Sequence, residues 1–133
     1  MDKVIVFCDG GSRGNPGPAA LGVVIKTTKG EIIEEIGEYL GEQTNNYAEY
    51  SAVITALNKL REMKVKSADF YLDSELAVRQ LNGIYKVKNE GLKVLYSKVL
   101  EAIGEMNITF THVYREDNTE ADAMVNQVLD SQK

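Results

Sequence analysis

Hydrophobic residues follow two different spacings along this chain, and the spacings predict alternating strands and helices. The continuous apolar run at residues 4–8 is typical of a strand covered on both faces, so we place it at the centre of a sheet. Residues 9–18 contain four glycines and both prolines, which predicts a loop whose backbone can approach a ligand closely. Residues 21–28 and 31–39 are extended segments joined by a turn at Lys29 and Gly30, so the first three strands are expected to be antiparallel neighbours.

Helical spacing dominates the rest of the chain. Apolar residues at positions 52, 53, 56, 57 and 60 predict a helix that begins at Thr44 or Asn45 and runs to about Met63. Strands are expected over 68–73 and 107–114, and helices over 74–81, 91–104 and 118–129. The order β-β-β-α-β-α-α-β-α indicates an α/β fold, with a five-stranded mixed sheet flanked by helices in one domain over residues 1–133.

Composition and charge narrow the class of protein. With 44% hydrophobic residues, 133 residues can bury a sizeable core, which excludes a largely disordered chain. The only cysteine, Cys8, cannot form an internal disulfide, and no apolar run has the length of a signal peptide or a membrane span. We therefore expect a cytoplasmic monomer with no membrane partner. A net charge of −5 excludes a protein that holds nucleic acid by bulk charge alone, so a nucleic-acid role requires a local site.

Two acidic residues lie on the apolar faces of predicted helices. Glu49 lies three, four, seven, eight and eleven residues before the apolar positions of its helix, so it points toward the sheet. Burying an ionised carboxylate costs several kcal/mol unless it is paired, protonated or bound to a metal, which favours a functional role. The alternative is that Glu49 lies at the helix start and reaches solvent. Glu42, by comparison, is expected in an exposed loop. Asp122 shares a face with Val125 and Leu129, although the helix dipole alone also favours an acid there.

Two further acids, Asp9 and Asp73, end predicted strands. Either one alone is compatible with a simple turn residue, but acids at the ends of neighbouring strands meet at one rim of an α/β sheet. Four converging carboxylates repel one another and retain protons near pH 7 unless a cation neutralises them. Oxygen ligands without histidine or cysteine select hard cations, so we predict that Asp9, Glu49, Asp73 and Asp122 bind Mg²⁺ or Mn²⁺.

Four motifs resemble those of type 1 ribonuclease H, in that family's order and across essentially the whole chain. They are DGGSRGNPGPA at 9–19, TNNYAE at 44–49, DSEL at 73–76, and REDN at 115–118 followed by Ala121 and Asp122. The family's active-site acids fall on Asp9, Glu49, Asp73 and Asp122, the same residues that the helix faces and strand ends single out.

The resemblance implies an endonuclease that uses two divalent ions to hydrolyse the RNA strand of RNA/DNA hybrids, leaving 5′-phosphate and 3′-hydroxyl ends. Small residues with free backbone groups suit recognition of the RNA 2′-hydroxyl in the shallow minor groove. In the alternative reading, residues 15–17 form only a turn and Thr44 is only a helix cap. By similarity, Gly10, Gly11, Ser12 and Asn45 would face the RNA, and Asn15, Thr44 and Asn46 would face the DNA strand.

The chain departs from the family in two places. Many members carry a long basic insertion between two helices near residues 80–95, whereas only residues 83–90 intervene here. Lys86 and Lys88 still provide candidate phosphate contacts, as do Lys93 and Lys98, although a solvated helix face explains Lys98 better than it explains Lys86 and Lys88. The family also often uses a mobile histidine before the last helix.

Two residues are candidates for that histidine's role. His112 alternates with Ile108 and Phe110 on one strand face, which favours a structural histidine. Arg115 lies in the loop itself, but an arginine cannot shuttle protons near neutral pH. Which of the two assists catalysis stays open.

Two other functions are compatible with part of the pattern. The same fold could bind a hybrid or double-stranded RNA without cutting it, although the presence of all four acids disfavours this. A phosphate-signalling α/β domain would also place aspartates at its strand ends, but it leaves the inward-facing Glu49 and the pair Asn45 and Asn46 unexplained.

Overall fold

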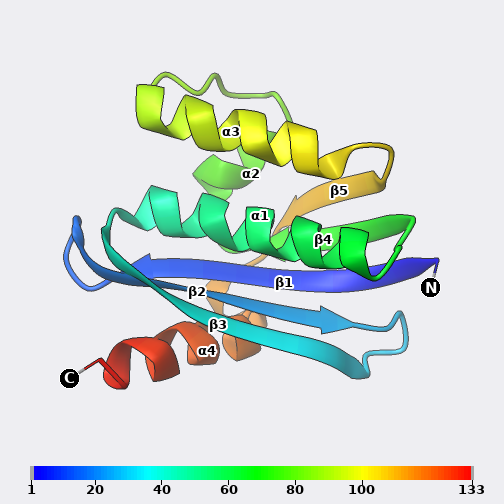
Figure 1. Cartoon of the computed structure of the whole chain (residues 1–133), viewed down its shortest axis with the longest axis horizontal. Coiled ribbons are helices and arrows are strands. Elements are labelled where there is room, and N and C mark those ends of the chain that lie inside the picture. The colour runs from blue at the N-terminus through cyan, green and yellow to red at the C-terminus, as the bar shows by residue number, and fades with distance from the viewer. Residues whose placement is uncertain (1, 133) are drawn as a thin grey trace.

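A five-stranded sheet forms the middle layer of the molecule, in the order β3-β2-β1-β4-β5 (Figure 1). The computed structural model describes residues 2–132, so the outermost residues of the predicted domain, Met1 and Lys133, lie outside the described part. The strands are β1 (Lys3–Ser12), β2 (Gly17–Lys26), β3 (Ile32–Gln43), β4 (Ser67–Leu72) and β5 (Asn107–His112). The helices are α1 (Asn45–Glu62), α2 (Glu75–Leu81), α3 (Glu90–Ile103) and α4 (Thr119–Asp130), and a 3-10 turn spans Arg115–Asp117.

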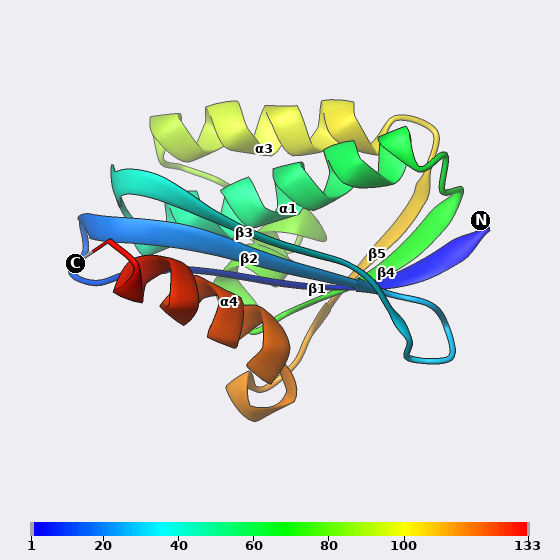
Figure 2. The same cartoon turned by 60° about the horizontal axis from the view of Figure 1, so that its bottom comes forward.

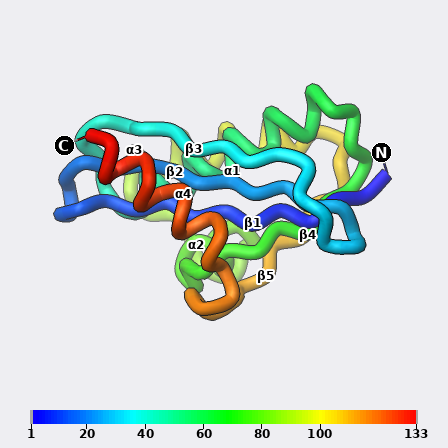
Figure 3. The backbone as a smooth tube through the Cα atoms, turned by 90° about the horizontal axis from the view of Figure 1, so that it is seen from below, coloured from blue at the N-terminus to red at the C-terminus, as the bar shows by residue number. Residues whose placement is uncertain are grey.

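The helices cover the sheet unequally. Helices α1, α2 and α3 lie on one face, with α1 next to the sheet and α3 farther out, while α4 alone packs on the other face (Figure 2). Seen from the α4 side, this helix runs along the half of the sheet formed by β1, β2 and β3 (Figure 3). Among the described residues, no helix is long and apolar enough to cross a membrane.

The strand pairing confirms the predicted α/β fold. Strand β1 is central and antiparallel to β2, β2 is antiparallel to β3, and β1–β4 and β4–β5 are parallel. Val4, Val6 and Cys8 are fully buried on one face of β1. Ile5 and Phe7 on the other face are half-buried, so the predicted covering of both faces is confirmed only in part. The core between the sheet and α1 includes Tyr50, Leu57 and Phe70.

The predicted loop over residues 9–18 is wrong at both ends. Strand β1 continues to Ser12, where Gly10, Gly11 and Ser12 pair with residues 21, 20 and 19 of β2, and only residues 13–16 form the connection. Glycine is costly in a strand in isolation, but here the ladder with β2 holds it in extended geometry. The small residues of this segment therefore belong to a strand and not to a mobile loop.

Other predicted boundaries shift by a few residues. Strand β3 continues to Gln43, so Glu42 lies on an exposed edge strand and not in a loop as expected. Strand β5 ends at His112, two residues earlier than predicted, because the chain then turns into the 3-10 segment. The turn at Gly30 is confirmed, with φ of 90° and a hydrogen bond from its amide to the Thr27 carbonyl at 2.9 Å.

Two glycines bring helices unusually close to the central strands. A Cβ at Gly10 would lie 2.2 Å from the backbone carbon of Ala48 in α1, and a Cβ at Gly22 would lie 2.3 Å from the Ala121 carbonyl oxygen in α4. Any larger residue would push the helix away. Because Ala48 precedes Glu49 and Ala121 precedes Asp122, these contacts set the depth of both acidic side chains relative to the sheet.

Candidate active site

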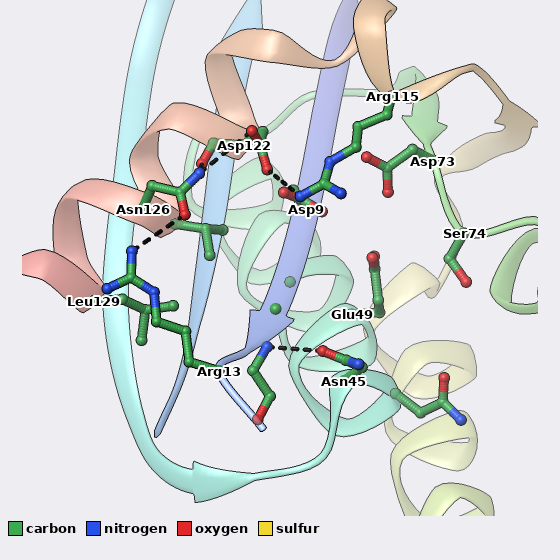
Figure 4. Close-up of a pocket in the computed structure, with 15 residues that line it drawn as sticks. Asp9, Arg13, Asn45, Glu49, Asp73, Ser74, Arg115, Asp122, Asn126 and Leu129 are labelled. Carbon is green, nitrogen blue, oxygen red and sulfur yellow. Dashed lines mark hydrogen bonds and ion pairs between the residues drawn. The ribbon is translucent and has the colours of Figure 1, made fainter. Parts of the chain in front are cut away.

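An open pocket of about 490 Å³ lies where β1 and β4 separate (Figure 4). The parallel pairing of these strands ends at Cys8 and Leu72, and the next residues are Asp9 and Asp73. Asp73 therefore follows the end of a strand, as predicted, whereas Asp9 lies inside β1, which continues to Ser12. The pocket is lined by Asp9, Gly10, Gly11, Ser12, Arg13, Asn45, Asn46, Glu49, Asp73, Ser74, Arg115, Asp122, Val125, Asn126 and Leu129.

Three carboxylates from three different elements meet in this pocket. Asp9 of β1, Glu49 of α1 and Asp73 after β4 each place one carboxylate oxygen within 4.8 Å of the others. Glu49 is only 6% exposed, which confirms that it points inward and excludes a solvent-reaching glutamate at the helix start. Its Oε2 is buried without a hydrogen-bond partner among residues 2–132. A buried carboxylate oxygen without a partner indicates a site that binds a cation or retains a proton.

Burial and mutual repulsion change the protonation of this cluster. Burial raises the pKa of Asp9 from 3.8 to about 8, with further contributions from the charge of Asp73, then from a hydrogen bond and charge of Asp122. Burial also raises the pKa of Glu49 well above its usual value, as do the neighbouring charges of Asp9 and Asp73. The amide of Gly10 partly offsets both shifts by hydrogen bonding to the ionised forms.

Asp122 lies beside the three clustered acids, at the mouth of the pocket. It is half-buried in the first turn of α4, and its Oδ1 accepts a hydrogen bond from Arg115 Nη2 at 3.3 Å. This contact with Asp122 raises the pKa of Arg115, which is already permanently charged. The structure thus brings all four predicted acids to one pocket, with a guanidinium at its mouth.

The donor set fits a hard divalent cation. Carboxylate oxygens without nitrogen or sulfur ligands are typical of Mg²⁺ and Mn²⁺ sites. The raised pKa values and the unpaired Glu49 oxygen are both relieved when a cation neutralises the cluster. The four acids are accordingly suited to bind divalent metal.

Most of the predicted substrate-contacting residues lie beside the acids. Gly10, Gly11, Ser12, Asn45 and Asn46 line the acidic pocket. Of these, Gly10 is buried, because its backbone packs directly against α1.

The other two, Asn15 and Thr44, line a neighbouring hollow of about 620 Å³ that shares Asn46 with the pocket. Their side chains hold the start of α1, because Thr44 Oγ1 accepts from the Tyr47 amide and Asn15 Oδ1 from the Asn45 amide, both at 3.1 Å. Thr44 is therefore a helix cap, as the alternative reading expected.

Asn45 connects the end of β1 to α1. Its Oδ1 accepts a hydrogen bond from the Ser12 amide at 2.8 Å, while Ser12 Oγ donates to the Gln43 carbonyl, also at 2.8 Å. These bonds fix the glycine-rich end of β1 against the start of the helix that carries Glu49.

Three further predicted residues line neither the acidic pocket nor the neighbouring hollow. Lys86 and Lys88 are exposed on the connection between α2 and α3, beside a hollow that also includes Lys93, Tyr85 and Tyr96. His112 is half-buried at the end of β5, where its ring meets Tyr114 edge to face with centroids 5.9 Å apart. This position agrees with the predicted strand face.

Several pocket residues escaped the sequence reasoning. Arg13 forms an ion pair with Asp130 at 2.8 Å. It also donates to Asn126 Oδ1 at 3.4 Å (Figure 4). Asn126 in turn donates to the Asp122 carbonyl at 3.2 Å. The position of Asn126, four residues after Asp122 on the same helix, could have identified it. Arg13 and Ser74 lie within the motifs, and Val125 and Leu129 share the helix face of Asp122, but these patterns alone assign none of the four to the pocket.

The sequence is similar to known proteins along nearly its whole length. Residues 7–128 match the reverse transcriptase-like family. Ribonuclease HI of Halobacterium salinarum is 38% identical over 129 residues, covering 96% of this chain and 65% of that protein. A bifunctional protein of Mycobacterium tuberculosis is 37% identical over 97% of this chain, but the match covers only 36% of its length. The chain therefore spans less than two thirds of these two curated relatives.

A solved structure shows the same architecture. The crystal structure of LC11-RNase H1 in complex with an RNA/DNA hybrid is 44% identical and superposes with a TM-score of 0.93, covering 97% of this chain and 98% of that one. That protein was isolated from compost by a metagenomic approach. The five-stranded sheet with its covering helices is thus common to this chain and to a hybrid-bound relative.

Proposed function

Because this chain belongs to the ribonuclease H family, we propose that it hydrolyses the RNA strand of RNA/DNA hybrids, leaving 5′-phosphate and 3′-hydroxyl ends. The observation that carries the proposal is the carboxylate cluster of Asp9, Glu49 and Asp73, which lies within an open pocket beside a polar surface suited to a nucleic-acid backbone. A protein that only bound hybrids would not need three repelling carboxylates in one pocket.

Asp9, Glu49, Asp73 and Asp122 would hold two ions of Mg²⁺ or Mn²⁺. When bound, the ions would supply activation of the attacking water and stabilisation of the leaving 3′ oxygen during in-line displacement at phosphorus. The chain's own contribution is to fix Asp9 on a strand, Glu49 and Asp122 on two packed helices, and Asp73 in the turn after β4, which keeps their oxygens in place before substrate arrives.

The glycine-rich end of β1 is suited to contact the RNA strand. Gly11 and Ser12 adjoin the acids and present a narrow surface that lets a ribose approach closely, and Gly10 adds backbone groups. Asn45 keeps its amide nitrogen available, because its oxygen is bonded to Ser12. A donor beside a close backbone approach can read the 2′-hydroxyl that distinguishes RNA from DNA.

The hollow beside the pocket is suited to contact the DNA strand. The oxygens of Asn15 and Thr44 already accept hydrogen bonds from α1 amides, which leaves the Asn15 amide and the Thr44 hydroxyl proton free to donate. Asn46 lines both cavities and would lie between the two strands of the hybrid. Donors of this kind position a duplex through its phosphates without reading its sequence.

Arg115 is suited to contact a phosphate at the mouth of the pocket. Its guanidinium is held by Asp122 and keeps its charge at all relevant pH values, so it can attract the substrate but cannot shuttle protons. His112 does not line the pocket, so we propose a structural role for it. Lys86 and Lys88 would add a few phosphate contacts at a distance from the chemistry.

A cleavage assay tests the proposal and separates it from binding without cutting. Labelled RNA/DNA, RNA/RNA and DNA/DNA duplexes would be incubated with Mg²⁺, with Mn²⁺ and with a chelator. We expect metal-dependent cleavage of the RNA in the hybrid, with ends that a 5′-phosphate-dependent exonuclease accepts. Hybrid binding without cleavage under any metal would instead identify a binding module.

Two broader properties complete the proposal. The lone buried Cys8 fits a reducing compartment such as the cytoplasm, since the chain needs no disulfide. We also propose that the chain acts as a monomer, because the pocket is assembled from elements of one chain. Light scattering at working concentration checks the oligomeric state.

A further inference from the structure

One buried amide joins the elements that carry Asp9 and Asp122. Asn118 immediately precedes α4 and is only 1% exposed. Its Nδ2 donates to the carbonyl oxygen of Cys8, the residue before Asp9, at 2.8 Å. Its own carbonyl accepts a hydrogen bond from the Asp122 amide at 3.1 Å. Two hydrogen bonds through one residue therefore connect the backbone beside Asp9 to the backbone of Asp122.

This amide acts at the point where the sheet opens. The ladder between β1 and β4 ends at Cys8 and Leu72. Backbone groups at the end of this ladder need other hydrogen-bond partners. The Leu72 carbonyl receives the Val113 amide at 2.9 Å, whereas the Cys8 carbonyl receives the Asn118 side chain. The start of α4 is thereby fixed to the strand that carries Asp9, at the edge of the pocket.

Stability alone is a poor explanation for an asparagine at this position. Its Oδ1 is buried and has no hydrogen-bond partner within residues 2–132, and the side chain makes no capping hydrogen bond to α4. The hydrogen bond to the Cys8 carbonyl stabilises the fold, but the buried acceptor without a partner costs a similar free energy, so the side chain adds little net stability. The hydrogen bond from Asn118 to Cys8 is therefore better explained by the position that it gives to α4.

We propose that Asn118 is a positioning residue, which holds α4 at the level where the Asp122 carboxylate faces Asp9. The inference rests on the proposed function, because it assigns Asn118 to the alignment of that carboxylate pair. Without the Nδ2 donor, the apolar contacts of Ala121, Val125 and Leu129 still hold α4 on the sheet. The helix is then free to slide, and small displacements of reacting groups cost large factors in rate.

The test compares Asn118→Leu with Asn82→Leu. Asn82 is a matched control because its Nδ2 also donates to a strand carbonyl, that of Phe110 at 3.0 Å, but it does not line the acidic pocket. Each protein is measured for kcat and KM on an RNA/DNA hybrid, for the midpoint of Mg²⁺ activation, for Mg²⁺ affinity by calorimetry without substrate, and for its urea unfolding midpoint. The Mg²⁺ affinity does not depend on the cleavage activity.

We expect Asn118→Leu to lose about tenfold or more in kcat, with little change in KM and a raised Mg²⁺ midpoint. Its loss of stability should be similar to that of Asn82→Leu, because each variant leaves one strand carbonyl without its donor. Asn82→Leu should lose stability with kcat unchanged. Wild-type kcat and Mg²⁺ affinity in Asn118→Leu would overturn the proposal.

If Asn118→Leu does not fold, Asn118→Ala takes its place under the same criteria, and failure of both to fold would show a structural residue. If the wild type itself does not cleave hybrids, the proposed function is wrong, and unchanged Mg²⁺ affinity in the variant then overturns the positioning role separately.

Discussion

Replacing Asp9 with asparagine should stabilise the metal-free protein while abolishing cleavage. The pKa of Asp9 rises from 3.8 to about 8, so the folded protein holds a proton over a pH range in which the unfolded chain has released it. Stability contributed by this proton is complete at low pH and is lost as the pH rises toward 8. The uncharged, similarly shaped asparagine removes both this titration and one source of repulsion on Glu49.

The size of this change in stability follows from the pH interval between the unfolded and folded pKa values of Asp9. Each pH unit between the two pKa values changes the free energy of unfolding by about 1.4 kcal/mol, so moving from pH 5 to pH 8 costs the wild type at most about 4 kcal/mol through this group. Because water enters the open pocket, we expect the observed figure to be about 2–4 kcal/mol. The variant should not show this decrease.

Urea unfolding at pH 5 and pH 8 in the presence of a chelator measures the difference. The quantity of interest is the stability of Asp9→Asn minus that of the wild type at each pH, since other groups titrate in both proteins. Glu42→Gln removes an exposed carboxylate of β3 and serves as the control for the loss of one negative charge. Added Mg²⁺ should stabilise the wild type and have little effect on Asp9→Asn. A pH-independent difference, or a variant less stable than the wild type at pH 8, would refute the electrostatic reasoning.

Three further predictions follow from the site. Glu49→Gln should abolish cleavage, whereas Glu42→Gln should retain wild-type kcat; equal effects in a cleavage assay would mean that the buried helix face does not identify the functional acid. Replacing both Lys86 and Lys88 with alanine should raise KM more than it lowers kcat and should reduce the salt slope of binding by about 0.9 for each phosphate that these lysines neutralise. An identical salt slope in both proteins would place these lysines in solvent. Gly22→Ala should destabilise the fold by about 1–3 kcal/mol and lower kcat, because its Cβ would meet the Ala121 carbonyl and displace α4. Unchanged unfolding and kinetics in this variant would show that the helix accommodates the methyl group.

Local patterns in the sequence predict the order of elements and the burial of Glu49. The uninterrupted apolar run of β1 predicts its central position in the sheet, although one face of the strand is fully buried and the other only half-buried. The helical spacing around Glu49 predicts its burial, because residues three and four apart share one face. Both inferences depend only on local periodicity, which the chain carries in its sequence.

Tertiary structure alone decided how the site is assembled. Gly10 and Gly11 favour a loop when taken locally, yet the ladder with β2 extends them into a strand, since pairing energy outweighs local preference. The contact between Asn118 and Cys8 joins residues 110 positions apart, and no local pattern encodes it. The same holds for Arg13 and Asn126, which are 113 positions apart. Periodicity specifies which face of an element is buried, whereas the partner across that face depends on the packing of the whole chain.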